Sequence, residues 1–240
     1  MAEGAGHALI VGASSGIGRA VAERLAGRMA VTALARRAER LEELTPLGVD
    51  GVICDATEYE ALGAAVEAAV AKHGKVSALV CAAGLQKIKP ARLLKPAELA
   101  EVLKVNLELP LFLAGLFTSR RVTADDGVYC VVSSIAALRP EPGILAYAAA
   151  KAGLEAMVKG LAREAAPRRV VAVAPGWLDT EMTQAYASLY DEAFRERLAR
   201  SAPGGIATVA AVVDCIDFLL SPAAAYITGE SIRVDGGAAL

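Results

Sequence analysis

Residues 7–18 read His7-Ala-Leu-Ile-Val-Gly-Ala-Ser-Ser-Gly-Ile-Gly18, an apolar run that leads into a turn with three glycines. The run at residues 7–11 predicts a buried strand, and residues 16–28 predict a helix with an apolar stripe. A strand, a glycine-rich turn and a helix in direct succession indicate the first unit of an α/β fold.

The turn contains Gly12, Gly16 and Gly18. In such a turn one glycine adopts backbone angles that other residues avoid, a second lets backbone N–H groups approach a pyrophosphate, and a third lets the helix pack close to the sheet. The helix N-terminus adds unpaired N–H donors, and Ser14 and Ser15 add hydroxyls. The turn therefore predicts a dinucleotide phosphate site, although its G-x-x-x-G-x-G spacing differs from the common G-x-G-x-x-G fingerprint.

Beyond the turn, strand-like and helix-like segments alternate along the chain. The expected strands are residues 7–11, 30–35, 51–54, 76–82, 127–133, 170–174 and 231–234. The expected helices are residues 16–28, 37–44, 57–73, 96–117 with a bend at Leu109-Pro110, 146–166 and 209–220. This alternation predicts one α/β domain, a Rossmann-type doubly wound parallel sheet of about seven strands with helices on both faces. Residues 177–206 break the alternation and are expected to form a substrate lid.

The composition agrees with parallel strands that are buried on both faces. Of the 240 residues, 55% are hydrophobic but only 5% are aromatic, so we expect an aliphatic core. A formal net charge of −2 does not suggest a nucleic-acid or anionic-membrane partner. The most apolar stretch, residues 107–117, contains a glutamate and a proline and is too short to span a bilayer. We therefore expect a cytoplasmic protein.

Metal and disulfide chemistry is not expected from the four cysteines and two histidines. The cysteines are scattered without a C-x-x-C pair, and Cys54, Cys81 and Cys130 lie in apolar runs. Buried reduced thiols are therefore expected, rather than disulfides, metal ligands or nucleophiles. Two histidines, His7 and His73, are few for a zinc site.

The end of the second expected strand favours NADP over NAD. NAD-linked sites usually place an acidic residue there, on the ribose 2′-hydroxyl. Here Ala35 is followed by Arg36 and Arg37, whose guanidiniums suit a 2′-phosphate that a carboxylate would repel. The alternative is that these arginines and Arg40 form a solvated helix face, paired with the glutamates at residues 39–43.

Asp55 and Ala56 follow the third expected strand and are assigned to the cofactor site. Asp55 could cap the next helix, but Thr57-Glu-Tyr-Glu60 has the form of a capping box and fills that role better. The carboxylate of Asp55 would then be free to accept a hydrogen bond from an adenine amino group.

Tyr147 and Lys151 stand four residues apart in an alanine-rich segment, so their side chains share one helix face. An ammonium beside a phenol favours the phenolate, so we expect the pKa of Tyr147 to fall below its usual value of about 10. Ser134 precedes Tyr147 at the end of an expected strand, and a strand end and the next helix start can converge on one crevice. Such a pair can also be an ordinary solvated contact, so its meaning depends on the rest of the chain.

Together, these residues resemble the short-chain dehydrogenase/reductase family. Nearly the whole chain is covered by the motifs Gly12-x-x-x-Gly16-Ile-Gly18, Asp55, Ala82-Ala83-Gly84, Asn106, Ser134, Tyr147-x-x-x-Lys151, Pro175-Gly176, Thr228-Gly229 and Val234-Asp235-Gly236-Gly237. The spacing of the Tyr–Lys pair is not that of the enoyl-reductase branch, which spaces the two residues more widely. Cys81 and Val171 stand where the family often has asparagines, which puts local packing in doubt, and the region of Gly205 lacks a Gly-Arg common in the family's lid.

The resemblance implies a role for each catalytic residue. Tyr147 would be the general acid, Ser134 would bond the carbonyl oxygen, Lys151 would hold the nicotinamide ribose and Asn106 would hold a water linking Lys151 to solvent. Thr180 would bind the nicotinamide carboxamide. With the glycine turn, the expected cofactor-binding set is Gly12, Ser14, Ser15, Gly16, Ile17, Gly18, Arg36, Arg37, Asp55, Ala56, Ala83, Gly84, Tyr147, Lys151, Pro175, Gly176 and Thr180.

The implied activity is the NADPH-dependent reduction of a ketone to a secondary alcohol. A basic loop at residues 87–95 could receive the anionic carrier of a 3-oxoacyl thioester, or could be an ordinary solvated loop. Met182, Tyr186, Leu189, Tyr190 and Phe194 could line a partly apolar pocket, or could be the buried side of lid helices. The alternatives are an alcohol or sugar dehydrogenase working in the oxidative direction, and a nucleotide-binding regulator without catalysis.

The expected partners are a small carbonyl or alcohol substrate and further copies of the chain. The helices at residues 97–118 and 147–166 carry more apolar surface than one sheet face needs. In the resembled family such helices pair across a dimer, and C-terminal strands help to build a tetramer, so a homotetramer or homodimer is implied.

Overall fold

The computed structural model describes residues 6–186 and 192–240 and confirms the predicted α/β fold. Its strands are β1 (His7–Val11), β2 (Ala30–Ala35), β3 (Val49–Ile53), β4 (Val76–Cys81), β5 (Thr123–Val132), β6 (Arg169–Pro175) and β7 (Ser231–Val234). Its α-helices are α1 (Gly16–Leu25), α2 (Ala38–Glu42), α3 (Tyr59–His73), α4 (Pro96–Leu103), α5 (Leu109–Thr118), α6 (Leu145–Glu164), α7 (Glu181–Gln184), α8 (Glu192–Ser201) and α9 (Val209–Leu220).

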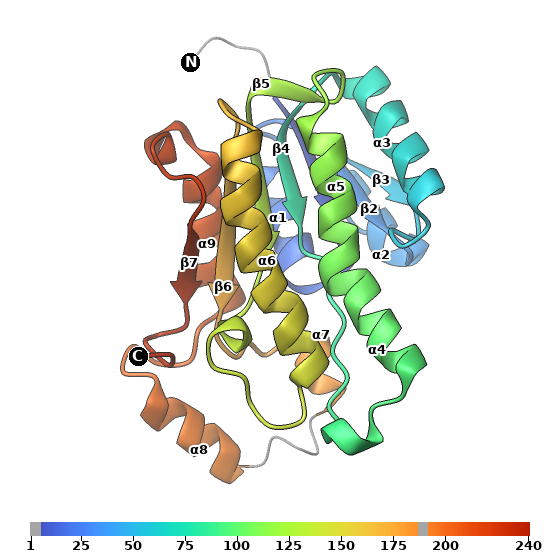
Figure 1. Cartoon of the computed structure of the whole chain (residues 1–240). Helices are drawn as coiled ribbons and strands as arrows, with labels where there is room; N and C mark the ends of the chain where they lie inside the picture. The colour runs from blue at the N-terminus through green and yellow to red at the C-terminus, as the bar shows by residue number, and fades with distance from the viewer. Residues whose placement is uncertain (1–5, 187–191) are drawn as a thin grey trace.

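The strands form one parallel sheet in the order β3-β2-β1-β4-β5-β6-β7. The order reverses between β1 and β4, so the chain winds outward in both directions from this point. In such sheets the ligand crevice lies beyond the carboxyl ends of the strands, at the reversal. Figure 1 shows these strand ends pointing toward the same end of the molecule as α7 and α8.

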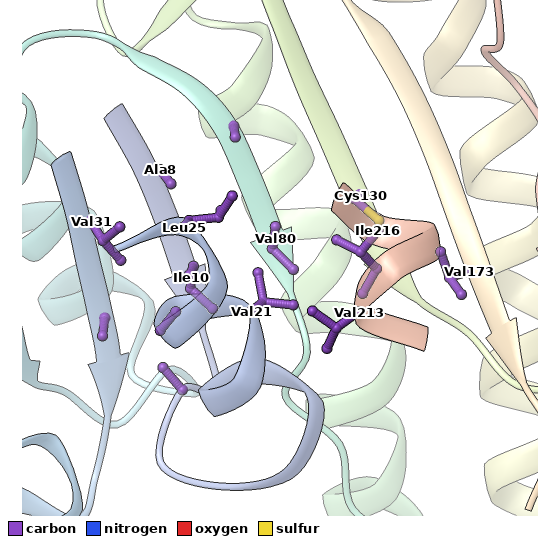
Figure 2. Packing of buried hydrophobic residues seen from close by; sticks show 14 of the residues in the cluster. Ala8, Ile10, Val21, Leu25, Val31, Val80, Cys130, Val173, Val213 and Ile216 are labelled. Atoms are coloured by element: carbon purple, nitrogen blue, oxygen red, sulfur yellow. The ribbon is translucent and has the colours of Figure 1, made fainter. Parts of the chain in front are cut away.

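The central strands of the sheet are buried because helices cover both of its faces. All five residues of β1 are buried, and they alternate between two core clusters, with Ile10 on one face and Leu9 on the other. Figure 2 shows the first cluster, where Val21 of α1 and Ile216 of α9 pack on the sheet. The second cluster is covered by α3, α5 and α6. Apolar side chains on both sides of a buried strand are what a parallel sheet covered on both faces requires.

The long helical region at residues 96–118 is interrupted, as expected. The interruption lies about one turn before the expected bend at Leu109-Pro110. Residues 104–108 form a π-helical turn between α4 and α5. Pro110 lies in the first turn of α5 and has no N–H, so it cannot donate to the preceding turn. Asn106 lies inside the π turn, is fully buried, and donates from Nδ2 to the Val102 carbonyl at 2.9 Å. Such turns concentrate at functional sites.

The predicted capping box at Thr57-Glu-Tyr-Glu60 is wrong. The residue that precedes α3 is Glu58, and no side chain caps the helix. The Thr57 hydroxyl instead donates to Asp55 Oδ1 at 2.8 Å, and the Thr57 backbone N–H donates to the same atom at 2.9 Å. An Asx turn therefore uses the residues that the sequence pattern had assigned to the cap.

The segment expected to form a lid contains α7 and α8, and residues 187–191, including the expected pocket residues Leu189 and Tyr190, lie outside the described residues. Within the described part of this segment, the Tyr186 hydroxyl donates to the Gln86 carbonyl at 2.8 Å, which joins α7 to the loop after β4. Among the described residues, no helix is both long enough and apolar enough to cross a membrane.

Candidate active site

The glycine turn lies where the strand order reverses and is packed too closely for side chains. Gly12 has φ +89°, and a Cβ there would lie 2.5 Å from the Ala83 nitrogen. A Cβ on Gly18 would lie 2.2 Å from the Gly12 carbonyl oxygen. Gly16 differs from these two glycines, because a Cβ there would make only an ordinary contact with Thr180 Cγ2 at 3.9 Å, and its φ of +54° is what favours glycine. The turn thus presents bare backbone at the start of α1, which fits the approach of a dinucleotide pyrophosphate.

Asn106 joins the π turn to the segment that follows β4. It donates from Nδ2 to the Leu85 carbonyl at 2.7 Å, and the Leu85 N–H donates back to Oδ1 at 3.3 Å. A Cβ on the neighbouring Gly84 would lie 3.4 Å from Oδ1. Ala83 and Gly84 are therefore held between the glycine turn on one side and Asn106 on the other.

Ser134, Tyr147 and Lys151 meet where β5 ends and α6 begins. Lys151 is 3% exposed, and its Nζ donates to the Val132 carbonyl at 2.8 Å while lying 5.5 Å from the centre of the Tyr147 ring. The Ser134 hydroxyl accepts the Ala136 N–H at 3.1 Å, and its hydrogen-bonding influence acts to lower the pKa of Tyr147. A phenol, a hydroxyl and an ammonium are thus gathered at the carboxyl edge of the sheet.

The expected lowering of the pKa of Tyr147 is wrong. Burial raises the pKa of Tyr147 to about 12, with the Ser134 hydrogen bond acting in the opposite direction. Burial also lowers the pKa of Lys151, to about 8. Desolvation disfavours the charged form of both groups and outweighs their attraction. The phenol is therefore protonated at neutral pH, the form that donates a proton.

The cysteine beside this site is not a reactive group. Burial raises the pKa of the Cys81 thiol to about 11, so it remains neutral. Cys54, Cys81 and Cys130 are buried and unbridged. Among residues 6–186 and 192–240, no three His, Cys, Asp or Glu side chains are grouped closely enough to hold a metal ion.

Arg36 and Arg37, both expected at the cofactor, have different surroundings. Arg36 extends into solvent with 76% of its side chain exposed, and its Nη1 lies 3.7 Å from Asp55 Oδ2. Arg37 folds over the glycine turn and donates from Nη2 to the Ser14 hydroxyl at 3.0 Å and from Nη1 to Glu181 Oε2 at 2.8 Å. The alternative of local helix-face pairing holds only for Arg40, whose Nη1 lies 3.7 Å from Glu43 Oε1.

Asp55 is not free in the way that the sequence suggested. Its Oδ1 accepts both the N–H and the hydroxyl of Thr57, and only Oδ2 remains, beside Arg36. These two bonds and the guanidinium lower the pKa of Asp55. Ala56 packs against the second core cluster at the same strand edge.

The remaining expected cofactor residues lie at or near the same edge. Ile17 packs against the first core cluster, next to the glycine turn. Pro175 ends β6, and a Cβ on Gly176 would lie 3.0 Å from Asp235 Cα. Thr180 precedes α7 and donates its N–H to the Thr183 hydroxyl at 2.9 Å. The fold therefore gathers segments from the first, middle and last parts of the chain around one edge.

Comparison with known proteins identifies the family. A family model described as "Enoyl-(Acyl carrier protein) reductase" matches residues 12–239. The 3-oxoacyl-[acyl-carrier-protein] reductase FabG of Escherichia coli (strain K12) is 33% identical over 236 residues, which cover 96% of each protein. The chain belongs to the short-chain dehydrogenase/reductase family.

Solved structures of other short-chain dehydrogenases/reductases have the same fold. A variant of actinorhodin polyketide ketoreductase with NADPH has a TM-score of 0.89 and 28% identity, over 98% of this chain and 97% of that one. The 3-ketoacyl-(acyl-carrier-protein) reductase from Brucella melitensis, complexed with NADH, has a TM-score of 0.85 and 30% identity over 98% of both chains. These relatives support a carbonyl reductase that uses a nicotinamide cofactor.

Two acidic residues near the site were missed by sequence reasoning. Glu155, one turn after Lys151, accepts hydrogen bonds from the hydroxyls of Ser133 at 2.6 Å and Ser231 at 3.0 Å, which tie α6 to β5 and β7. Glu181 contacts Arg37 from the far side of the glycine turn. Glu155 could have been found from the sequence, because it stands one helical turn after Lys151 and therefore lies on the same face of the helix. Glu181 had none, because it is 144 residues from Arg37.

Proposed function

We propose that this protein is an NADPH-dependent reductase that converts a ketone, of the 3-oxoacyl thioester class, to a secondary alcohol. The observation that carries the proposal is the meeting of Ser134, Tyr147 and Lys151 beside the bare glycine turn. A binding protein without catalysis has no need of a buried phenol next to an ammonium.

Tyr147 is the proton donor in this proposal. With its pKa raised to about 12, the phenol is protonated at working pH and can give its proton to a carbonyl oxygen. Ser134 donates a hydrogen bond to the same oxygen and stabilises the charge that develops there. Lys151, held by the Val132 carbonyl, keeps a positive charge near the phenol and binds the nicotinamide ribose. Asn106 holds a water that connects Lys151 to solvent.

The cofactor is assigned from the groups around the glycine turn. When bound, a nicotinamide dinucleotide supplies the hydride that the carbonyl carbon receives. Gly12, Gly16 and Gly18 would admit its pyrophosphate, and the absence of a carboxylate at Ala35 together with the guanidiniums that follow favours a 2′-phosphate. One of the two similar structures holds NADPH and the other holds NADH. The proposed preference for NADPH over NADH therefore rests on Ala35 and the two arginines that follow it in this chain.

The substrate class is supported by the relative named as a 3-oxoacyl reductase and by the Tyr–Lys spacing. The basic loop gives weaker support, because Lys87 lies 3.2 Å from Glu101 and Lys89 lies 2.5 Å from Glu98. Two of its cations are thus neutralised by α4. The description of the matching family model names an enoyl reductase instead, so an enoyl thioester is the necessary comparison substrate.

Assembly into a homodimer or homotetramer is part of the proposal. Leu99 of α4, Leu111 of α5 and Leu145 of α6 are 39%, 48% and 61% exposed, and these helices lie on one side of the molecule (Figure 1). Exposed leucines gathered on neighbouring helices favour burial against a second copy.

The proposal is tested by following NADPH oxidation with acetoacetyl-CoA, crotonyl-CoA and an aldehyde as substrates. We expect turnover with acetoacetyl-CoA and none with crotonyl-CoA. Reduction of crotonyl-CoA alone would assign enoyl reduction. If no substrate in a broad ketone series were reduced, a catalytic role would be refuted.

A further inference from the structure

Glu181 connects α7 to the groups that surround the glycine turn. Its Oε2 accepts from Arg37 Nη1 at 2.8 Å, and its Oε1 accepts from Arg40 Nη2 at 3.3 Å. Arg37 also donates from Nη2 to the Ser14 hydroxyl at 3.0 Å. One carboxylate therefore contacts two guanidiniums that lie 144 and 141 residues away in the chain.

This set of donors is suited to a phosphate. Guanidiniums and hydroxyls at the start of a helix bind phosphate oxygens, and a carboxylate uses the same donors with less charge. The reacting residues do not explain the contact, since Glu181 has no hydrogen bond to Ser134, Tyr147 or Lys151 among the bonds of the described residues. The Glu181 carboxylate is thus an anion of the protein itself that uses donors suited to a phosphate.

We propose that Glu181 is a specificity-determining residue, whose carboxylate occupies the 2′-phosphate position on Arg37 and Arg40 until NADP(H) displaces it. The inference rests on the proposed preference for NADPH and adds Arg40 to the phosphate ligands. NADH has no 2′-phosphate, so it binds without displacing Glu181. The carboxylate therefore lowers the affinity for NADPH but not for NADH. When NADPH displaces it, the contact between the start of α7 and Arg37 is broken.

The size of the effect follows from the exposure of the groups. The side chains of Arg37, Arg40 and Glu181 are 38%, 41% and 46% exposed, so water screens their attraction. Ion pairs of this kind contribute little, and loss of the competing carboxylate should tighten a 2′-phosphate ligand by about two- to fivefold at low salt. The effect should shrink as salt is added.

The test is calorimetric binding of 2′,5′-ADP and 5′-ADP to the full chain and to Glu181→Gln, with NADPH and NADH as second probes. We expect Glu181→Gln to bind 2′,5′-ADP and NADPH about two- to fivefold more tightly, with 5′-ADP and NADH unchanged. Glu23→Gln is the matched control, because Glu23 pairs with Arg19 and has no ion pair with Arg37 or Arg40 among the described residues. It removes the same charge nearby and should leave all four affinities within about 1.5-fold of the wild type.

Three results would overturn the inference. Unchanged affinities in Glu181→Gln would mean that the carboxylate does not compete. Weaker binding of both NADPH and NADH would mean that Glu181 closes over the bound cofactor instead. Equal tightening in Glu23→Gln would mean a general charge effect. The proposed function is tested separately by Arg37→Ala: if this variant binds NADPH as the wild type does, the NADPH preference fails, whatever Glu181 does.

Discussion

The two halves of the candidate site are built differently. At the junction of β5 and α6, Lys151 and Asn106 are buried and bonded to backbone carbonyls. At the end of β2, Arg36 is exposed and Arg37 is partly exposed, and each is paired directly with a carboxylate at the surface. Backbone partners cannot be exchanged without moving the sheet, whereas exposed ion pairs are weak and easily replaced. The difference suggests that the chemistry is fixed by the fold and the cofactor preference is set by the surface.

The largest effect is expected from Tyr147→Phe, which removes the proposed proton donor but keeps the ring. We expect kcat to fall by about 10²- to 10⁴-fold, because general acid catalysis is lost. NADPH affinity, measured by fluorescence titration, should change by no more than about threefold, since one hydroxyl is removed. Retained turnover would rule out the acid role of Tyr147, while loss of NADPH binding would show that the tyrosine serves mainly to hold the cofactor.

The next effect concerns the buried cation. The pKa of Lys151 is about 8 in the folded chain and 10.5 in its ordinary state, so between these values the unfolded chain binds more protons. Lys151 should therefore contribute a rise in the free energy of unfolding with pH across this window, of up to about 1.4 kcal/mol per pH unit. The buried thiols of Cys81 and Cys130, whose pKa values are raised, contribute a slope of the opposite sign, so the Lys151 part is the difference between the wild type and Lys151→Met. Urea denaturation between about pH 8 and pH 9.5 measures this slope.

Lys151→Met should lose this part of the slope, because methionine has no proton to bind. Lys159→Met, an exposed position on the same helix, should keep the wild-type slope and is the control. Equal slopes in the wild type and Lys151→Met would show that Lys151 keeps its ordinary pKa on folding.

The smallest effect is expected on the surface half of the site. Arg37→Ala should weaken NADPH binding by about five- to twentyfold and leave NADH within about twofold, because a charge-assisted bond to the 2′-phosphate is lost. Arg36→Ala should weaken NADPH less, since Arg36 points toward solvent and Asp55 rather than toward Ser14. A larger effect at Arg36 than at Arg37 would reverse this assignment.

The parts of the structure that follow local patterns could be predicted from the sequence. The apolar run before Gly12 and the alternation of strands and helices determined the sheet, because buried parallel strands need that pattern. The Tyr147–Lys151 pairing followed from helical spacing alone. The position of the π turn at residues 104–108 could not be predicted in this way. Pro110, which has no N–H to donate, lies after the π turn rather than inside it.

The electrostatics of the site could not be predicted from the sequence. The spacing showed that Lys151 is near Tyr147 but not that both are buried, and burial reverses the sign of the expected pKa shift. Asp55 and Thr57 offered two local hydrogen-bond arrangements, and the sequence pattern favoured the wrong one. The contact of Glu181 with Arg37 exists only because the fold brings the start of α7 to the glycine turn.

The central claim is that this chain transfers hydride from NADPH to a ketone with Tyr147 as the acid. It is tested most directly by reacting acetoacetyl-CoA with NADPH that carries deuterium at the transferring position of nicotinamide C4, and analysing the product by mass spectrometry. We expect a 3-hydroxyacyl thioester with one deuterium at C3 from the wild type and almost none from Tyr147→Phe in the same time. An unlabelled product, or equal labelled product from both proteins, would contradict the claim.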